Sequence, residues 1–241
     1  MADKKEKQQS FWEQYKKETS TPIYSLVLVL PLIFIYEAGV LLIDEHSWRD
    51  TSLLVNDTIQ LIFHKFGAHR STLIPACLVM ITLFLLQFKS DRKWELRTSN
   101  VLLMHVEYLV YAAILFVGVA WIYEGGFSFD PPGSRKVLMA MGAGIYEEYL
   151  FRLVLLSLLF AGMEKGLKVD KTRGIYAAVL LSAVCFAGFH YVLDNDSFEW
   201  AGFFVRTAAG VFFGFLCLTR GYGTAAGTHV AFNVLRELFC R

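Results

Sequence analysis

Long apolar segments dominate this sequence, and their length constrains the fold more than any other feature. Several of them approach the roughly 20 residues that a helix needs to cross the hydrocarbon core of a bilayer. Hydrophobic residues make up 55% of the 241-residue chain, above the about 45–50% of ordinary soluble domains. Because backbone groups inside a membrane must bond within their own segment, such stretches predict α-helices. The predicted fold class is therefore all-α, a polytopic transmembrane helix bundle.

About seven spans are predicted, and an eighth span or a re-entrant piece would change the position of the C-terminus. Their expected bounds are 22–43, 72–88, 101–123, 137–162, 174–192, 200–218 and 223–239. The stretch 44–71 between the first two is mixed and suggests a short interfacial helix. Residues 1–21 are polar and lysine-rich, and we expect a cytoplasmic tail there, followed by a single integral membrane domain over 22–241.

Lysine and arginine are concentrated in the segments on one side of the predicted bundle. These segments are the N-terminal tail and the loops after the second and fourth spans, whereas the loop after the fifth span is acidic. By the positive-inside rule, the N-terminus is predicted to be cytoplasmic. The net charge is only +1, which gives no global basic field for nucleic acid. The cysteines, none of which forms a CxxC pair, are interpreted as small core residues: Cys77, Cys185, Cys217 and Cys240.

The fourth predicted span contains three ionisable residues between long apolar runs. Left unpaired at membrane depth, Glu147, Glu148 and Arg152 would cost about 8–10 kcal/mol on an insertion scale. Glu148 and Arg152 are four residues apart, so they share a helix face and can form an ion pair. Glu147 lies about 100° further round the helix and is free to face something else.

Two further spans carry polar side chains at four-residue spacing. Phe186 and His190 share one face of the fifth span, and His229 and Asn233 share one face of the seventh. Each pair alone is equally compatible with an interfacial residue or with contacts between helices. Together with Glu147 they are the groups needed to hydrolyse a peptide bond, because a carboxylate and an imidazole can activate water. A second imidazole and an amide can stabilise the resulting oxyanion.

These three segments resemble, in order and spacing, the motifs of the CPBP intramembrane proteases. That family includes the type II CaaX prenyl endopeptidases and many bacterial relatives, and its motifs read EExxxR, FxxxH and HxxxN. The resemblance covers about residues 135–241, which becomes the predicted catalytic core. It implies that Glu147 and His190 activate water and that His229 and Asn233 form the oxyanion hole. It also implies supporting roles for Glu148, Arg152 and Phe186.

The resemblance leaves the metal question open, since the family is often described as metalloproteases. A zinc ion could be held by Glu147, His190 and His229 with water as fourth ligand. We favour no cofactor, because the amide of Asn233 is a poor zinc ligand and a good oxyanion donor. Helical rise places His190 further from the inner membrane face than Glu147 and His229. Either the fifth span begins later than Gly174, or its inner end projects from the membrane.

The function predicted from these residues is endoproteolysis inside the membrane, on a membrane-associated or lipid-modified peptide or protein. The alternative is a non-catalytic partner-binding protein on the same fold, such as an immunity or chaperone-like factor. A transporter is a third possibility, but no paired broken helices favour it. Compact loops suggest a bacterial plasma (inner) membrane, with membrane lipids as the surrounding partners. Outside the motifs, Glu107 and Arg206 are a candidate structural pair.

Overall fold

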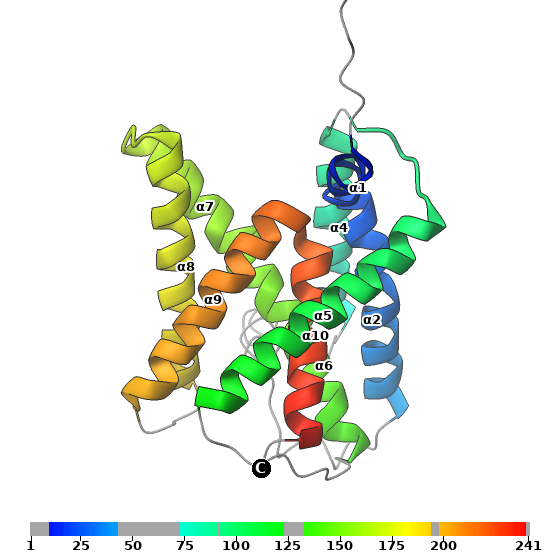
Figure 1. The fold of residues 1–241 in the computed structure, drawn as a ribbon, viewed down its shortest axis with the longest axis vertical. Coiled ribbons are helices and arrows are strands. Elements are labelled where there is room, and N and C mark those ends of the chain that lie inside the picture. The colour runs from blue at the N-terminus through cyan, green and yellow to red at the C-terminus, as the bar shows by residue number, and fades with distance from the viewer. Residues whose placement is uncertain (1–9, 43–72, 91, 123–132, 194–197, 240–241) are drawn as a thin grey trace, which may run out of the picture.

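The computed structural model describes residues 10–42, 73–90, 92–122, 133–193 and 198–239, and these ranges are helical apart from short connections. The predicted all-α class is confirmed, with no strand in these ranges. The interfacial helix predicted within 44–71 lies outside them. Figure 1 shows the helices as a bundle in which α5 and α9 cross the others obliquely. Their bounds are α1 Phe11–Thr19, α2 Pro22–Leu42, α4 Leu73–Lys89, α5 Thr98–Ile122, α6 Ser134–Glu148, α7 Leu156–Ala161, α8 Lys171–Leu193, α9 Trp200–Arg220 and α10 Tyr222–Phe239.

Within the described ranges, four helices are long and apolar enough to cross a membrane: α2, α5, α8 and α9. The helix α4 is apolar but shorter. Two predicted spans are not among these four: the fourth, which corresponds to α6–α7, and the seventh, which corresponds to α10. Both carry polar residues of the motifs. A count of about seven spans thus remains a prediction.

The predicted fourth span is a continuous helical rod that changes type along its length. Between α6 and α7 the chain forms a π-helical segment, Tyr149–Leu155, and a second one follows α7 at Gly162–Gly166. The first begins directly after Glu148 and contains Arg152. Such π-helical turns are uncommon and occur often at functional sites.

The helix α8 begins at Lys171, earlier than the predicted Gly174. This is where the helix begins, and a later start of the membrane span within it stays a prediction. Figure 1 shows α7 and α8 as a hairpin whose connected ends lie at the height of α1, far along the bundle from the C-terminus. An inner end that projects from the membrane stays a prediction.

The helix α10 is the centre of the bundle and packs against α2, α5, α6 and α9. Small residues at its start allow this, since Gly223 and Gly227 lie so close to α2 and α5 that an added Cβ would come within 2.6 Å of Ser25 and 2.8 Å of Tyr108. The turn from α9 into α10 requires Gly221, whose φ of 89° disfavours other residues. The sequence thus places α10, with His229 and Asn233, deep inside the protein.

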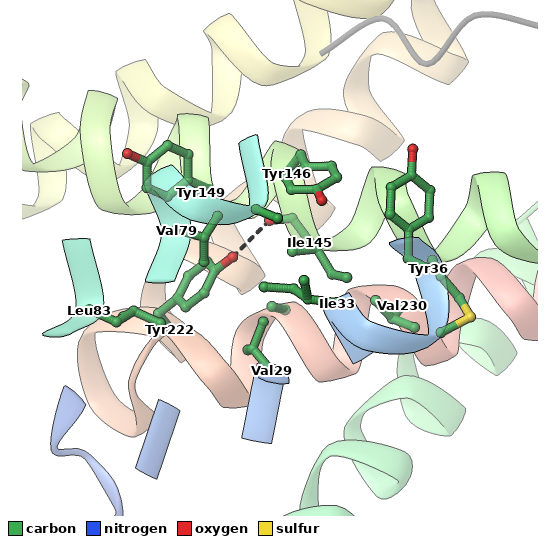
Figure 2. Packing of buried hydrophobic residues seen from close by; sticks show 13 residues of the cluster. Val29, Ile33, Tyr36, Val79, Leu83, Ile145, Tyr146, Tyr149, Tyr222 and Val230 are labelled. Carbon is green, nitrogen blue, oxygen red and sulfur yellow. Dashed lines mark hydrogen bonds between the residues drawn. The ribbon is translucent and has the colours of Figure 1, made fainter. Parts of the chain in front are cut away.

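The largest apolar cluster packs around the start of α10 and the end of α6. It contains side chains of α2, α4, α6 and α10, including Val29, Val79 and Ile145. Figure 2 shows the Tyr222 hydroxyl donating a hydrogen bond to the Ile145 carbonyl oxygen, at 2.8 Å. This bond and the surrounding packing fix the end of α6 against α10, two residues before Glu147.

The predicted polar tail contains the amphipathic helix α1. A capping box starts it, with Ser10 and Glu13 each bonded to the backbone N–H of the other. Tyr15 and Thr19 are buried against the bundle, one turn apart. At least this part of the tail is therefore packed on the membrane domain.

Candidate active site

Glu147 and Glu148 are the last two residues of α6, and their side chains diverge as the helix geometry predicts. The Glu148 side chain is completely buried, whereas that of Glu147 is 10% exposed. Gly144 makes this placement possible, because a Cβ there would lie 2.6 Å from the backbone nitrogen of Val230 on α10. The close approach of α6 and α10 puts both carboxylates beside the His229 ring.

Glu148 joins two helical segments through its two carboxylate oxygens. Its Oε2 lies 3.1 Å from Nε of Arg152, so the predicted ion pair is confirmed. Its Oε1 accepts a hydrogen bond of 2.8 Å from Nδ1 of His229. The contact with His229 was not predicted, and it makes Glu148 an anchor of the histidine ring as well as the partner of Arg152.

Arg152 is a buried cation surrounded mainly by aromatic rings. Its guanidinium lies 4.6 Å from the centre of the Phe186 ring and 5.6 Å from that of Phe213. Its Nη2 donates to the Gly210 carbonyl oxygen at 3.3 Å, while Nη1 has no hydrogen-bond partner in the described part of the chain. The carboxylate of Glu148 is thus the main group that stabilises the positive charge of Arg152, and the faces of the aromatic rings add to it.

Hydrogen bonds define which nitrogen of each histidine carries a proton. Nδ1 of His190 lies 3.0 Å from the Phe186 carbonyl oxygen, which can only accept, so Nδ1 is the donor. Nδ1 of His229 donates in the same way to the carboxylate of Glu148. In a neutral ring, the basic lone pair is therefore on Nε2 in both residues.

Both Nε2 atoms face the same oxygen of Glu147. The Nε2 of His190 is 3.9 Å from Oε2 of Glu147, and that of His229 is 3.8 Å from it. These separations are too long for direct hydrogen bonds but short enough for one water molecule to contact both groups at about 2.8 Å. The structure thus brings a carboxylate from α6 and imidazoles from α8 and α10 around one point.

Aromatic rings hold the two imidazoles in position. Phe186 packs its ring edge to face with His190, at 4.9 Å between centres, and also contacts His229 at 6.0 Å. Phe213 of α9 stacks on His229, with centres 4.5 Å apart and planes 19° from parallel. These ring contacts restrict rotation of the two imidazoles away from Glu147.

Asn233 lies one helical turn beyond His229 on α10. Its Nδ2 donates a 3.3 Å hydrogen bond to the carbonyl oxygen of Ala140 on α6. The second N–H of this amide is not used by that bond.

The three central side chains differ in their access to the outside. The exposed fraction is 19% for the His190 side chain, 10% for Glu147 and 5% for His229. His190 is therefore the most exposed of the three and His229 the most buried.

The comparisons with known proteins agree with the motifs. The family model described as type II CAAX prenyl endopeptidase, Rce1-like, matches residues 134–235. Residues 134–235 are thus similar to an Rce1-like domain. The matched range holds every residue of the cluster described above. Comparison with curated proteins and with solved structures gave no match. This match and the four long apolar helices among the described residues support an integral membrane protein.

Glu147 lies further from His190 and from His229 than two ligands of a tetrahedral zinc ion lie from each other. Two ligands on a tetrahedral zinc lie about 3.4 Å apart, whereas the two nitrogen–oxygen distances to Glu147 are 3.9 and 3.8 Å. In the described ranges no group of three His, Cys, Asp or Glu side chains is placed to hold a metal ion.

Two residues of α9, inside the matched range, were missed by sequence reasoning. Phe213 stacks on His229. The carbonyl oxygen of Gly210 accepts a hydrogen bond from Arg152. Gly210 also allows α9 to contact α8, since a Cβ there would lie 2.9 Å from Ala183. The signal that could have found them is the GxxxG spacing of Gly210 and Gly214, which marks a close helix–helix contact. Phe213 lies inside that motif.

The suggested pair of Glu107 and Arg206 is wrong. Glu107 instead binds Arg220 through both oxygens, at 2.5 and 2.7 Å, and accepts a 2.7 Å hydrogen bond from Tyr15 of α1. Burial and this carboxylate together raise the pKa of the Tyr15 hydroxyl. Arg206 donates to the Tyr191 hydroxyl at 2.8 Å. The Glu107–Arg220 cluster therefore fastens α1 to the corner from which α10 begins.

Proposed function

We propose that this chain is an intramembrane endopeptidase that hydrolyses a peptide bond of a membrane-associated substrate. One observation carries the proposal: the Glu147 carboxylate lies within 4 Å of the Nε2 atoms of both His190 and His229. The Rce1-like match supports it, because that family model describes an endopeptidase.

In this mechanism, a water molecule sits between Glu147 and His190. Glu147 takes a proton from it as the water oxygen attacks the substrate carbonyl carbon, and Nε2 of His190 orients the water by accepting its second hydrogen bond. The Nδ1–H of His190 is committed to the Phe186 carbonyl, so this nitrogen keeps its lone pair directed at the water. General-base assistance of this kind contributes roughly 10²- to 10⁴-fold to a rate.

His229 and Asn233 are the proposed oxyanion hole. A His229 ring with protons on both nitrogens donates Nε2–H to the oxyanion, while Glu148 behind Nδ1 balances its charge. Asn233 contributes the N–H that its bond to Ala140 leaves free. Collapse of the tetrahedral intermediate breaks the C–N bond, and Glu147 returns its proton to the leaving amine. The products are a carboxylic acid, which keeps the second water proton until it ionises, and an amine.

Glu148, Arg152 and Phe186 are proposed as positioning residues. Glu148 fixes the His229 ring, Arg152 neutralises Glu148, and Phe186 packs on both histidines and on the guanidinium. Their role is to hold the reacting groups at separations that a single water can bridge. Because the cluster lies among membrane helices, we propose a membrane-associated or lipid-modified substrate and a bacterial plasma membrane as the location.

The test compares newly formed peptide termini in membranes from cells that carry the wild-type chain, Glu147→Gln or Glu164→Gln. Glu164 is the matched control, since it is exposed and lies in the π-helical turn Gly162–Gly166, away from the cluster. We expect a set of termini that the wild type and the control share and that Glu147→Gln lacks. Identical termini in all three would instead favour the non-catalytic partner-binding alternative.

A further inference from the structure

A polar cavity of about 380 Å³ opens between α1, the start of α2 and the segment 92–97 that follows α4. Its size is at the lower end of the range for ligand pockets. Four cationic side chains line it together with two acidic ones: Lys17, Arg92, Lys93, Arg97, Glu18 and Glu95. In Figure 1, α1 lies beside the upper ends of α2 and α4, where this connection to α5 starts.

Two buried amides hold the cationic segment in place. The Gln87 side chain, which is fully buried, accepts from the backbone N–H of Ile23 at 3.0 Å and donates to the Arg92 carbonyl at 3.2 Å. Asn100 is also buried and donates to Glu18 of α1 at 2.8 Å. The Tyr24 hydroxyl accepts from the backbone N–H of Arg97 at 3.0 Å. The cavity wall is thus a fixed surface and not a loose loop.

The acidic residues of the cavity are already paired. Glu18 lies 3.5 Å from Arg97, and Glu95 lies 3.5 Å from Lys93. For Lys17 and Arg92, no carboxylate partner lies within the described part of the chain. The cavity therefore presents two cations, one from α1 and one from segment 92–97, whose charge is left for an anion.

Aromatic residues beside the cavity define its depth in the membrane. Trp94 packs against Phe84 of α4, with ring centres 5.5 Å apart, and both are about half exposed. Phe11 and Trp12 of α1 are exposed as well. Tryptophan next to an apolar helix end is characteristic of the membrane–water interface. At that depth the abundant anion is the phosphate of a lipid headgroup.

We propose that this cavity binds the headgroup of one anionic phospholipid, with Lys17 and Arg92 contacting its phosphate. The acyl chains then run along the apolar surface of α4 beside Phe84 and Trp94. Because α1 forms one wall, the bound lipid also ties this helix to the membrane domain.

The test uses the purified full chain in mixed micelles that contain equal amounts of phosphatidylglycerol and phosphatidylcholine, with native mass spectrometry to identify bound lipid. We expect one phosphatidylglycerol to be retained selectively. The double variant Lys17→Gln/Arg92→Gln should bind it about 30-fold more weakly, from two lost cation contacts. The control Lys16→Gln/Lys89→Gln removes the same charge from exposed positions outside the cavity and should bind as the wild type does.

Three results would overturn the proposal. Equal retention of the two lipids by the wild type would remove the selectivity for an anionic headgroup. Equally weakened lipid binding in both double variants would show that binding depends on general surface charge and not on this cavity. Displacement of the lipid by millimolar glycerol 1-phosphate would make the ligand a soluble phosphate compound.

Discussion

Replacing Arg152 by methionine should destabilise the protein by leaving Glu148 as a buried, uncompensated carboxylate. Both side chains are essentially inaccessible to solvent, and their charges approach to 3.1 Å. Methionine retains most of the contact with Phe186 and Phe213, so the loss is mainly electrostatic. Removing one partner of a buried ion pair costs about 3–5 kcal/mol in soluble proteins.

The assay is thermal unfolding of the purified protein in detergent. A soluble chain of this length loses about 2–4 °C for each kcal/mol, so the melting temperature should fall by roughly 6–20 °C. The double variant Glu148→Gln/Arg152→Met removes both charges and leaves an amide oxygen to accept from His229. It should melt above the single variant, because no buried charge remains unpaired.

Arg236→Met is the matched control, since Arg236 is exposed and lies 3.7 Å from Glu237. Surface pairs of this kind are worth about 0–1 kcal/mol, so its melting temperature should stay near that of the wild type. A double variant no more stable than Arg152→Met would refute the reasoning, because the cost of the single change would then not come from an unpaired Glu148.

Three further predictions concern the site. Asn233→Ala should lower kcat by about 100-fold or more with little change in KM, as for a lost oxyanion donor; steady-state kinetics check this, and an effect on KM alone would make Asn233 a substrate-binding residue. Gly144→Val should prevent α6 from packing on α10, because a Cβ there meets the Val230 nitrogen at 2.6 Å; the variant should lose most of its folded yield in detergent, and wild-type yield would contradict the close contact. Treatment with 1,10-phenanthroline should leave turnover unchanged, and inhibition that added zinc reverses would support a metal on Glu147, His190 and His229.

Contacts within one helix could be predicted from the sequence because helical spacing fixes them. The pairing of Glu148 with Arg152 follows from their four-residue separation, and the structure has that ion pair. The same spacing put Phe186 beside His190, and their rings are in contact. Apolar length likewise predicted the helices, to within a few residues at most ends.

Contacts between helices could not be derived in this way, because they depend on which faces pack together. Nothing in the spacing of residues connects Glu148 to His229, yet that hydrogen bond orients the ring. The suggested partner of Glu107 was wrong for the same reason. Arg220 reaches Glu107 because α9 crosses the bundle obliquely and ends beside α1 and α5. The positions of charged residues along each span do not reveal how the helices cross.

Sequence reasoning did locate Glu147, His190 and His229 on three separate helices, and the structure brings them around one point. Their proposed roles rest on the family resemblance and on this geometry together. The π-helical turn after Glu148 could not be recognised in the sequence. Its i→i+5 hydrogen bonds require no particular residue type.

The central claim is that Glu147 is the base that activates water for peptide-bond hydrolysis. The most direct test measures turnover by purified protein in lipid nanodiscs, using a peptide that spans a cleavage site identified from the membrane termini. Glu147→Gln keeps the shape and removes the base, so turnover should fall by about 10²- to 10⁴-fold while the melting temperature stays unchanged. Near wild-type turnover by Glu147→Gln would contradict the account.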